Sequence, residues 1–245
     1  MRSLLVAAVG SLSISQFAMA NTFVGNSRTA VVLGEYPAAA VGKLLTASGD
    51  CTATLVAKNL ILTASHCIFT NGKLKTGKFY FKLQQRITKI TYFWFGNPLP
   101  ETYQSDDWAI GKLESNYNTW IPVARVPPEQ IATLPQTSLF SFSQDINFGN
   151  SLLAEYGCGV TQFLSQHNLL LHNCSTSYGA SGAPLIYFPD PKNPKGAQIV
   201  AINTAQRMPW GENKTLINIP FKNDLANTAV STNRFYENLQ QALNQ

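Results

Sequence analysis

The chain has 245 residues, of which 45% are hydrophobic and 13% charged, whereas an average soluble domain carries roughly 25% charged residues. This apolar content can fill a packed core and excludes a mainly disordered chain. The formal net charge is +5, but the basic residues are dispersed, so we expect no nucleic-acid partner. No apolar stretch reaches the roughly 18 residues that span a bilayer, so we expect no membrane anchor.

The first twenty residues have the pattern of a secretory signal peptide. Arg2 gives a positive start, Leu4–Phe17 is mostly apolar, and Ala18–Ala20 forms an A-x-A cleavage site. We therefore expect cleavage after residue 20 and a secreted product, extracellular or periplasmic; a buried N-terminal helix is the alternative. Residues 21–28 are a candidate short propeptide, with a second cleavage near Arg28 as a hypothesis.

Cysteine usage agrees with export. The four cysteines are an even set and fall into two local couples, Cys51 with Cys67 and Cys158 with Cys174. In an exported chain such a set favours disulfides. Of the three connectivities we favour the local one, because each bridge then closes a short loop and stabilises by roughly 3 kcal/mol. A zinc site is the alternative, but no C-x-x-C or H-x-x-x-H pair occurs, so we expect no metal.

The body of the chain reads as short apolar and β-branched runs separated by turn residues. Strands are expected at Thr52–Ala57, Leu60–Ala64, Lys78–Leu83, Ile87–Phe95, Trp108–Leu113, Trp120–Val126, Leu139–Phe142, Ser151–Tyr156, Phe163–Leu171, Pro184–Phe188, Gln198–Thr204 and Thr215–Ile219. Lys58-Asn59 joins the first two runs and predicts a hairpin. Such regular spacing favours an all-β sandwich or barrel over βαβ units.

Only the C-terminal tail has a helical pattern. Phe235, Leu239 and Leu243 recur at four-residue spacing after the polar cluster Ser231–Asn233, which could cap the start of a helix. The Pro127-Pro128 region is the best candidate for a linker between two halves of the chain.

Three short strings contain the residue types that nucleophilic catalysis by serine requires. They are Leu62–Cys67 (LTASHC), Asp106–Ile110 (DDWAI) and Gly179–Pro184 (GASGAP). A serine nucleophile needs an imidazole to take its proton and a carboxylate to orient that imidazole. It also needs backbone N–H groups aimed at the developing oxyanion. Each string alone is a moderate signal, but together and in this order they are a strong one.

These strings resemble the motifs of the trypsin/chymotrypsin-like serine proteases, and the sequence looks closest to the bacterial glutamyl-endopeptidase-like (V8-like) branch. The family's L-T-A-A-H-C motif matches Leu62–Cys67, with Ser65 in place of the second Ala. The D-I-A-L motif matches Asp107–Ile110, which selects Asp107 over Asp106. The G-D-S-G-G-P motif matches Gly179–Pro184.

The resemblance implies roles for individual residues. His66 would be the general base, Asp107 the orienting acid and Ser181 the nucleophile. The backbone N–H groups of Gly179 and Ser181 would form the oxyanion hole. Ala180 stands where digestive members carry the Asp that captures a new N-terminus on activation, so that switch would be absent or built differently.

The resemblance also implies an all-β fold of two six-stranded antiparallel β-barrels (chymotrypsin-like) with a C-terminal helix. The N-terminal barrel would span residues 29–126 and carry the base and the acid. The C-terminal barrel, with the helix, would span residues 127–245 and carry the nucleophile. No cofactor is implied.

The specificity pocket is predicted less sharply. Ser175 stands where trypsins carry Asp, which argues against a preference for Arg or Lys. Thr176 matches a Thr that helps to bind the substrate carboxylate in glutamyl endopeptidases, but Asn203 replaces their pocket histidine. A glutamate preference and a preference for an uncharged polar or medium-sized side chain therefore both stay open. Thr204 is predicted to hydrogen-bond Asp107.

These observations predict a secreted, monomeric serine endopeptidase acting on protein or peptide substrates. The alternative is a protease-like binding protein, an adhesin or host-interaction factor, on the same fold. An α/β-hydrolase needs a histidine after the serine, and none follows His172. A subtilisin-type order would need Asp50, which lies too close to the base. His167 and His172 match no family motif and are interpreted as surface or structural residues.

Overall fold

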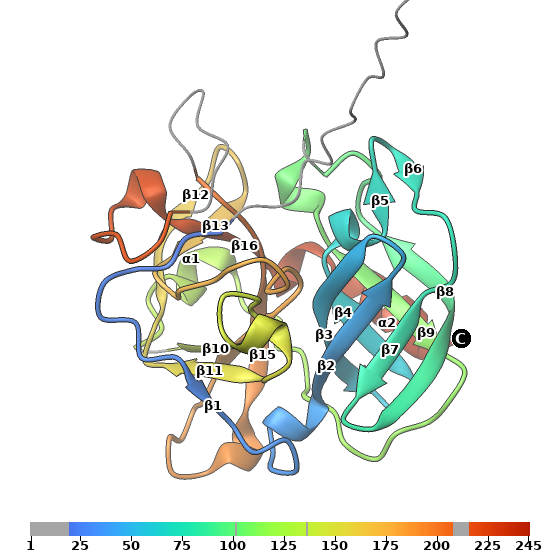
Figure 1. Ribbon diagram of the computed structural model, residues 1–245. Helices are drawn as coiled ribbons and strands as arrows, with labels where there is room; N and C mark the ends of the chain where they lie inside the picture. The colour runs from blue at the N-terminus through green and yellow to red at the C-terminus, as the bar shows by residue number, and fades with distance from the viewer. Residues whose placement is uncertain (1–19, 101, 136, 208–215) are drawn as a thin grey trace, which may run out of the picture.

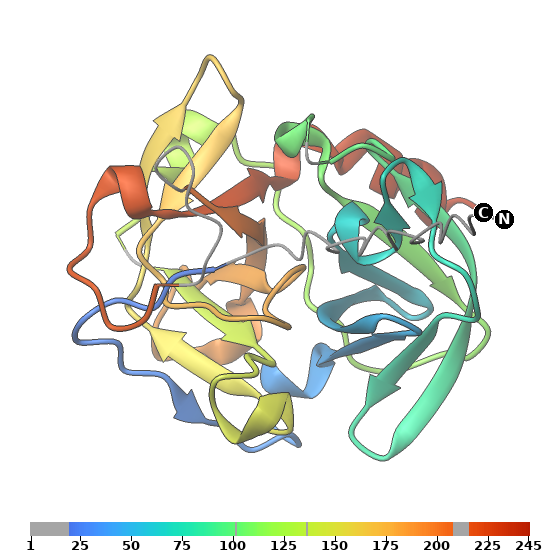
Figure 2. The same ribbon diagram turned by 45° about the horizontal axis from the view of Figure 1, so that its top comes forward.

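The chain forms two β-sheet units packed side by side (Figure 1). The computed structural model describes residues 20–100, 102–135, 137–207 and 216–245. The units remain side by side when the molecule is turned (Figure 2). In the described residues no helix is both long and apolar enough to cross a membrane.

The N-terminal unit is a closed antiparallel barrel with the strand order β2-β3-β4-β9-β8-β7. Its strands are β2 Val41–Thr46, β3 Gly49–Ala57, β4 Leu60–Thr63, β7 Tyr80–Leu83, β8 Arg86–Phe95 and β9 Ala109–Leu113, and a separate small hairpin pairs β5 Phe69–Thr70 with β6 Lys73–Leu74. The predicted hairpin is confirmed, with Leu55 opposite Ile61. Apolar side chains from both faces of this hairpin are buried, so the barrel has a continuous core.

The C-terminal unit is a single eight-stranded sheet with the order β1-β11-β10-β14-β15-β16-β13-β12. Its strands are β1 Thr29–Ala30, β10 Thr137–Ser141, β11 Leu153–Tyr156, β12 Val160–Leu164, β13 Leu169–His172, β14 Pro184–Tyr187, β15 Gln198–Gln206 and β16 Asn227–Ser231. This half is an open sheet of eight strands where a six-stranded barrel was expected, while the all-β fold with a C-terminal helix is confirmed. Strand β12 pairs only with β13, and the N-terminal segment β1 adds to the opposite edge, so the hydrogen-bonded ring stays open.

Three expected strands differ in the structure. Residues 120–126 form no strand and contribute one isolated bridge, Val123 to Ile199, because Pro122 lies within the segment. The long run at 163–171 is two strands, since the chain turns through Asn168, which has a φ of 50°. In the last expected strand, Thr215 lies outside the described residues and Ile219 makes only an isolated bridge.

The C-terminal helix α2 spans Tyr236–Leu243 and returns to the N-terminal barrel. The ring of Phe235 packs 5.7 Å from that of Trp108, just before β9, and Lys112 donates to the carbonyl oxygen of Gln245. No side chain caps the helix, because it begins only after a 3-10 turn, η7 (Thr232–Arg234). The short helix α1, Pro128–Ile131, lies in the predicted linker region. The helix therefore ties the end of the chain to its first half.

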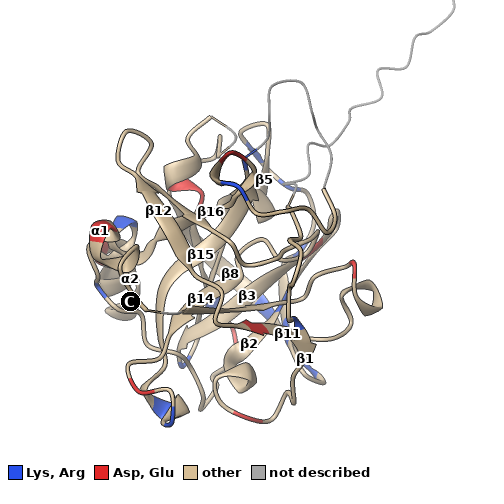
Figure 3. Cartoon of the chain, turned by 90° about the vertical axis from the view of Figure 1, so that its left-hand side faces the viewer, with Lys and Arg blue, Asp and Glu red and all other residues tan. Residues whose placement is uncertain are grey.

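Both favoured disulfides are present. Cys51 on β3 bonds Cys67, and Cys158 bonds Cys174, with S–S distances of 2.07 and 2.11 Å. Lysine, arginine, aspartate and glutamate are scattered over the chain in Figure 3, in line with the low charged fraction. Each half is thus held together mainly by a disulfide and an apolar core, rather than by large ion-pair networks.

Candidate active site

His66 is presented at the end of β4, where the chain leaves the barrel. It is the middle residue of a 3-10 turn, η2 (Ser65–Cys67), and the Cys51–Cys67 bridge anchors that turn to β3. The imidazole side chain is 15% exposed, so it is accessible to a substrate while its backbone is held. Asp107 follows the 3-10 turn η3 (Gln104–Asp106), immediately before β9. Because β4 and β9 are hydrogen-bonded neighbours, the two side chains meet at the same end of the barrel.

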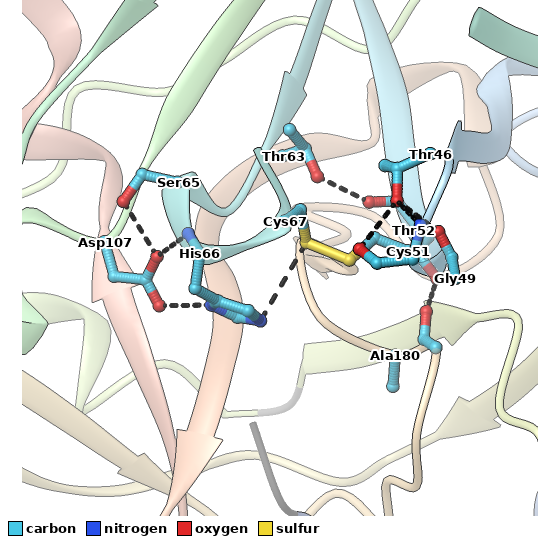
Figure 4. The surroundings of a disulfide bond; sticks show 12 residues. Thr46, Gly49, Cys51, Thr52, Thr63, Ser65, His66, Cys67, Asp107 and Ala180 are labelled. Atoms are coloured by element: carbon cyan, nitrogen blue, oxygen red, sulfur yellow. Dashed lines mark hydrogen bonds and ion pairs between the residues drawn. A yellow bond between two sulfur atoms is a disulfide. The ribbon is translucent and has the colours of Figure 1, made fainter. Parts of the chain in front are cut away.

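The two side chains form a tight pair (Figure 4). Asp107 Oδ2 lies 2.7 Å from His66 Nδ1, and Asp107 Oδ1 accepts from the His66 backbone N–H at 2.9 Å. Burial by itself would raise the pKa of Asp107, but the adjacent imidazole and the hydrogen bonds from His66 and Ser65 bring that pKa below its usual value. An ionised carboxylate at this position keeps the Nδ1 proton in place and leaves Nε2 free to accept one.

The neighbouring carboxylate has a different partner. Asp106 pairs with Arg234 through two contacts of 2.6 and 3.0 Å. The structure thus gives the two adjacent aspartates separate partners, and only Asp107 reaches the imidazole.

Ser181 lies in a tight turn before β14, 7% exposed. Its carbonyl oxygen accepts from the backbone N–H of Thr52 at 2.9 Å. A Cβ on the following residue, Gly182, would stand 2.3 Å from Thr63 Oγ1, and its φ of +79° also requires glycine. The turn is therefore pressed against the strand end that carries His66. In the part of the chain that the structure describes, no hydrogen bond joins Ser181 Oγ to His66 Nε2, as is common before substrate binds.

The predicted oxyanion donors lie in the same turn. Gly179 has a φ of +88°, and its carbonyl oxygen is held by the Thr52 hydroxyl at 2.7 Å. The N–H of Ala180 donates to Ser177, but the N–H groups of Gly179 and Ser181 donate to no group among the described residues. Two backbone donors without protein acceptors beside a serine are what an oxyanion site requires.

The three predicted pocket residues are all buried beside this turn. Asn203 uses both ends of its amide: Nδ2 donates to the Ala180 carbonyl oxygen at 2.9 Å, and Oδ1 lies 3.1 Å from His172 Nε2. Ser175 Oγ accepts from the N–H of Phe23. Thr176 Oγ1 is buried and has no hydrogen-bond partner among the described residues.

His172 was interpreted as a surface or structural residue, and it is fully buried on β13. Because Asn203 Oδ1 can only accept, His172 must carry its proton on Nε2. Burial lowers the pKa of His172 to about 4, so the imidazole is neutral near neutral pH. His172 therefore holds the predicted pocket residue Asn203 in place. His167, by contrast, is exposed.

Thr204 differs from its prediction. Its hydroxyl lies 3.3 Å from the carbonyl oxygen of Thr228 on the neighbouring strand β16, and in the described structure it makes no hydrogen bond to Asp107. The hydroxyl that reaches Asp107 belongs instead to Ser65, at 3.0 Å. The serine for alanine change in the His-containing motif was the only sequence signal for this contact.

Sequence reasoning also missed the segment just after the predicted cleavage site. Asn21 is fully buried, its N–H donates to Asn227 Oδ1 at 2.8 Å, and its carbonyl oxygen accepts from Thr176 N at 2.9 Å. Nearby, Glu155 accepts from Ser175 N at 2.6 Å, and burial raises the pKa of this carboxyl group. The N-terminal segment therefore forms part of the wall behind the predicted pocket.

The described residues around His66 do not form a suitable set of metal ligands. Cys51, His66 and Cys67 lie close together, but both sulfur atoms are joined in the disulfide and offer no thiolate.

Comparison with known proteins agrees with this geometry. The family model for trypsin matches residues 30–151, about half of the chain, which includes His66 and Asp107 but ends before Ser181. No curated protein sequence matches the chain.

Solved structures share the fold. A Glu endopeptidase in complex with MPD aligns with a TM-score of 0.69 and 19% identity, covering 91% of this chain and 100% of that chain. A thermostable serine protease, AL20, from an extremophilic microorganism gives 0.59 and 18%, covering 83% and 96%. Mouse neuropsin, a serine protease, gives 0.62 and 14%, covering 89% and 99%. With the trypsin match and the fold together, the chain belongs to the trypsin-like family of serine proteases.

Proposed function

We propose that the protein is a secreted serine endopeptidase that hydrolyses peptide bonds through Ser181, His66 and Asp107. The observation that carries this proposal is the His66–Asp107 pair, with its 2.7 Å contact, beside a serine turn that holds two backbone N–H groups without acceptors. The remaining element of such a site is the nucleophile, and the candidate for it is Ser181 in the glycine-containing turn before β14.

The mechanism follows from these positions. Ser181 Oγ attacks the substrate carbonyl carbon while His66 Nε2 takes the hydroxyl proton, and Asp107 stabilises the resulting imidazolium. The N–H groups of Gly179 and Ser181 donate to the oxyanion. His66 then gives the proton to the leaving amine, and water attacks the acyl-enzyme with His66 again as the base.

The test is labelling with a fluorophosphonate, together with digestion of casein. We expect wild type to be labelled and active, and Ser181→Ala to lose labelling and to lose proteolysis by several orders of magnitude. Ser177→Ala, a buried serine on the same turn, is the matched control and should keep both. Retained cleavage in Ser181→Ala would refute the mechanism. No hydrolysis or labelling in wild type would favour the alternative, a binding protein on the same fold.

We also propose that the mature chain begins at Asn21. This residue is held by hydrogen bonds to Asn227, Thr176 and Leu225, and removal of residues 21–28 as a propeptide would leave those groups without partners. N-terminal sequencing of the secreted protein tests the proposal, and a mature form that begins at Thr29 would refute it.

Cleavage at that point bears on specificity. It would turn the Asn21 amide nitrogen into an ammonium group close to the pocket residue Thr176. A positive charge there favours an acidic or uncharged polar substrate side chain over lysine or arginine. Matched peptides with Glu, Gln or Lys before the scissile bond measure this preference as a ratio of kcat/KM, and the Lys peptide should be the poorest substrate.

A further inference from the structure

The hydroxyl group of Ser65 occupies an unusual position beside the catalytic pair. Ser65 is fully buried, and its Oγ lies 3.0 Å from Asp107 Oδ1 and 3.1 Å from the carbonyl oxygen of Asn97 (Figure 4 shows the contact with Asp107). A hydroxyl has one proton, while a carbonyl oxygen and an ionised carboxylate only accept. Because the carboxylate is charged, it is the stronger acceptor of the two.

This contact completes the set of donors that fix the carboxylate. Asp107 Oδ1 receives two donors, the His66 backbone N–H and the Ser65 hydroxyl, so the carboxylate cannot rotate without losing both. Oδ2 is then left facing His66 Nδ1 at 2.7 Å. Thr204, the residue predicted to donate from the other half of the molecule, bonds Thr228 instead.

We propose that Ser65 is a positioning residue, whose hydroxyl holds the Asp107 carboxylate in the orientation that aligns His66. The proposal rests on the proposed function, because it deepens the description of the same site. The family's motif has alanine at this position, and alanine has no side-chain donor.

The electrostatic surroundings of the pair are otherwise simple. Besides His66, the charged groups on elements next to Asp107 in the described structure include Asp106 and Arg234, which pair with each other through two contacts, and Lys112 on β9, which donates to the carbonyl oxygen of Gln245. Without the Ser65 donor the carboxylate is freer to rotate, so its hydrogen bond to the Nδ1 proton of His66 should weaken.

The first experiment compares Ser65→Ala with Thr204→Val, which removes the rival hydroxyl. Alanine fits the site, so Ser65→Ala should fold, with a modestly lower Tm because the Asn97 carbonyl oxygen and Asp107 lose a donor. We expect its kcat to fall about 3- to 10-fold with KM unchanged, because the lost bond acts on His66 and not on substrate binding. Thr204→Val should leave kcat and KM at their wild-type values.

The second experiment does not depend on turnover. In a Ser181→Ala background, the Nδ1 proton of His66 is followed by its downfield NMR resonance with and without Ser65→Ala. We expect faster exchange of that proton with solvent when the hydroxyl is absent.

The outcomes separate the two proposals. If Ser65→Ala leaves the exchange rate of the Nδ1 proton unchanged, or if only Thr204→Val raises it, Ser65 is not a positioning residue. A loss of Tm without any fall in kcat also overturns the proposal, because it shows a purely structural contact through Asn97. If wild type has no hydrolytic activity that depends on Ser181, the endopeptidase proposal fails while the NMR measurement still decides the role of Ser65.

Discussion

The hydroxyl of Thr52 joins the two halves of the molecule at the serine turn, so its removal should lower both stability and activity. It donates to the Gly179 carbonyl oxygen at 2.7 Å and accepts from the N–H of Phe142 at 3.0 Å. Thr52→Val preserves the shape of the side chain and removes only the oxygen. The carbonyl of Gly179 and the N–H of Phe142 then lose their partner at a contact that excludes most water.

The expected size follows from these two bonds. Each buried polar group left without a partner costs about 1–3 kcal/mol, so with two such groups the free energy of unfolding should fall by about 2–6 kcal/mol. In a chain of this length, each kcal/mol lowers Tm by about 2–4 °C. The kcat should fall about tenfold, because Gly179 becomes less well fixed, whereas full loss of an oxyanion donor costs about 100- to 1000-fold.

The matched control lies two residues further along the same strand. Thr54 is also buried, but its hydroxyl has no hydrogen-bond partner in the described structure, so Thr54→Val removes an unsatisfied group and should cost no stability. Denaturant unfolding, followed by circular dichroism, and kcat on a peptide ester are measured for both variants. The Thr52 hydroxyl does not hold the two halves together if the free energy of unfolding of Thr52→Val stays within about 1 kcal/mol of wild type, which is the typical net value of one hydrogen bond. The same conclusion follows if Thr54→Val loses as much stability as Thr52→Val.

Three further predictions concern the acid, the buried histidine and the N-terminal anchor. Asp107→Asn should lower kcat about 10⁴-fold, whereas Asp106→Asn should change it only a few-fold; equal losses in kinetic assays would contradict the choice of Asp107. Burial lowers the pKa of His172 from 6.5 to about 4. As the pH falls below 6.5, the unfolded chain therefore binds a proton that the folded chain does not. The free energy of unfolding should thus be at its full value above pH 6.5 and fall by about 3 kcal/mol toward pH 4. Denaturant curves of His172→Gln should lack this component, and an unchanged pH dependence would rule it out. Asn227→Ala removes two hydrogen bonds to Asn21 and one to Cys174, so it should raise KM and lower Tm. A variant with wild-type KM and Tm would show that the attachment of Asn21 to Asn227 is dispensable.

Local patterns were enough to predict most of the N-terminal half. The hairpin ending at Thr63 has a clear turn signal between two apolar and β-branched runs, and the structure forms it. By contrast, strand β16 (Asn227–Ser231) was missed because its residues are small and polar. It is a strand because β13 and β15 pair with it on both sides, which is a tertiary effect that no local pattern contains.

The same distinction applies to the site. The pairing of His66 with Asp107 could be predicted because each residue lies in its own recognisable string, at a strand end. A hydroxyl that donates to Asp107 was predicted at Thr204, whereas in the structure this hydroxyl belongs to Ser65. The Thr204 hydroxyl bonds Thr228 on the neighbouring strand β16 instead, and that strand was absent from the prediction.

The predicted specificity pocket changes most when the structure is considered. Asn203 was expected to offer its amide to the substrate, but one end of that amide holds Ala180 and the other holds His172. One of the two Nδ2 protons is thus already used, and the oxygen already accepts a hydrogen bond from a neutral imidazole. The hydroxyl of Thr176 has no partner in the described structure, so it retains its whole hydrogen-bonding capacity. Polar selectivity in this pocket should therefore depend on Thr176 and on the charge at Asn21, with Asn203 holding the turn in place behind them.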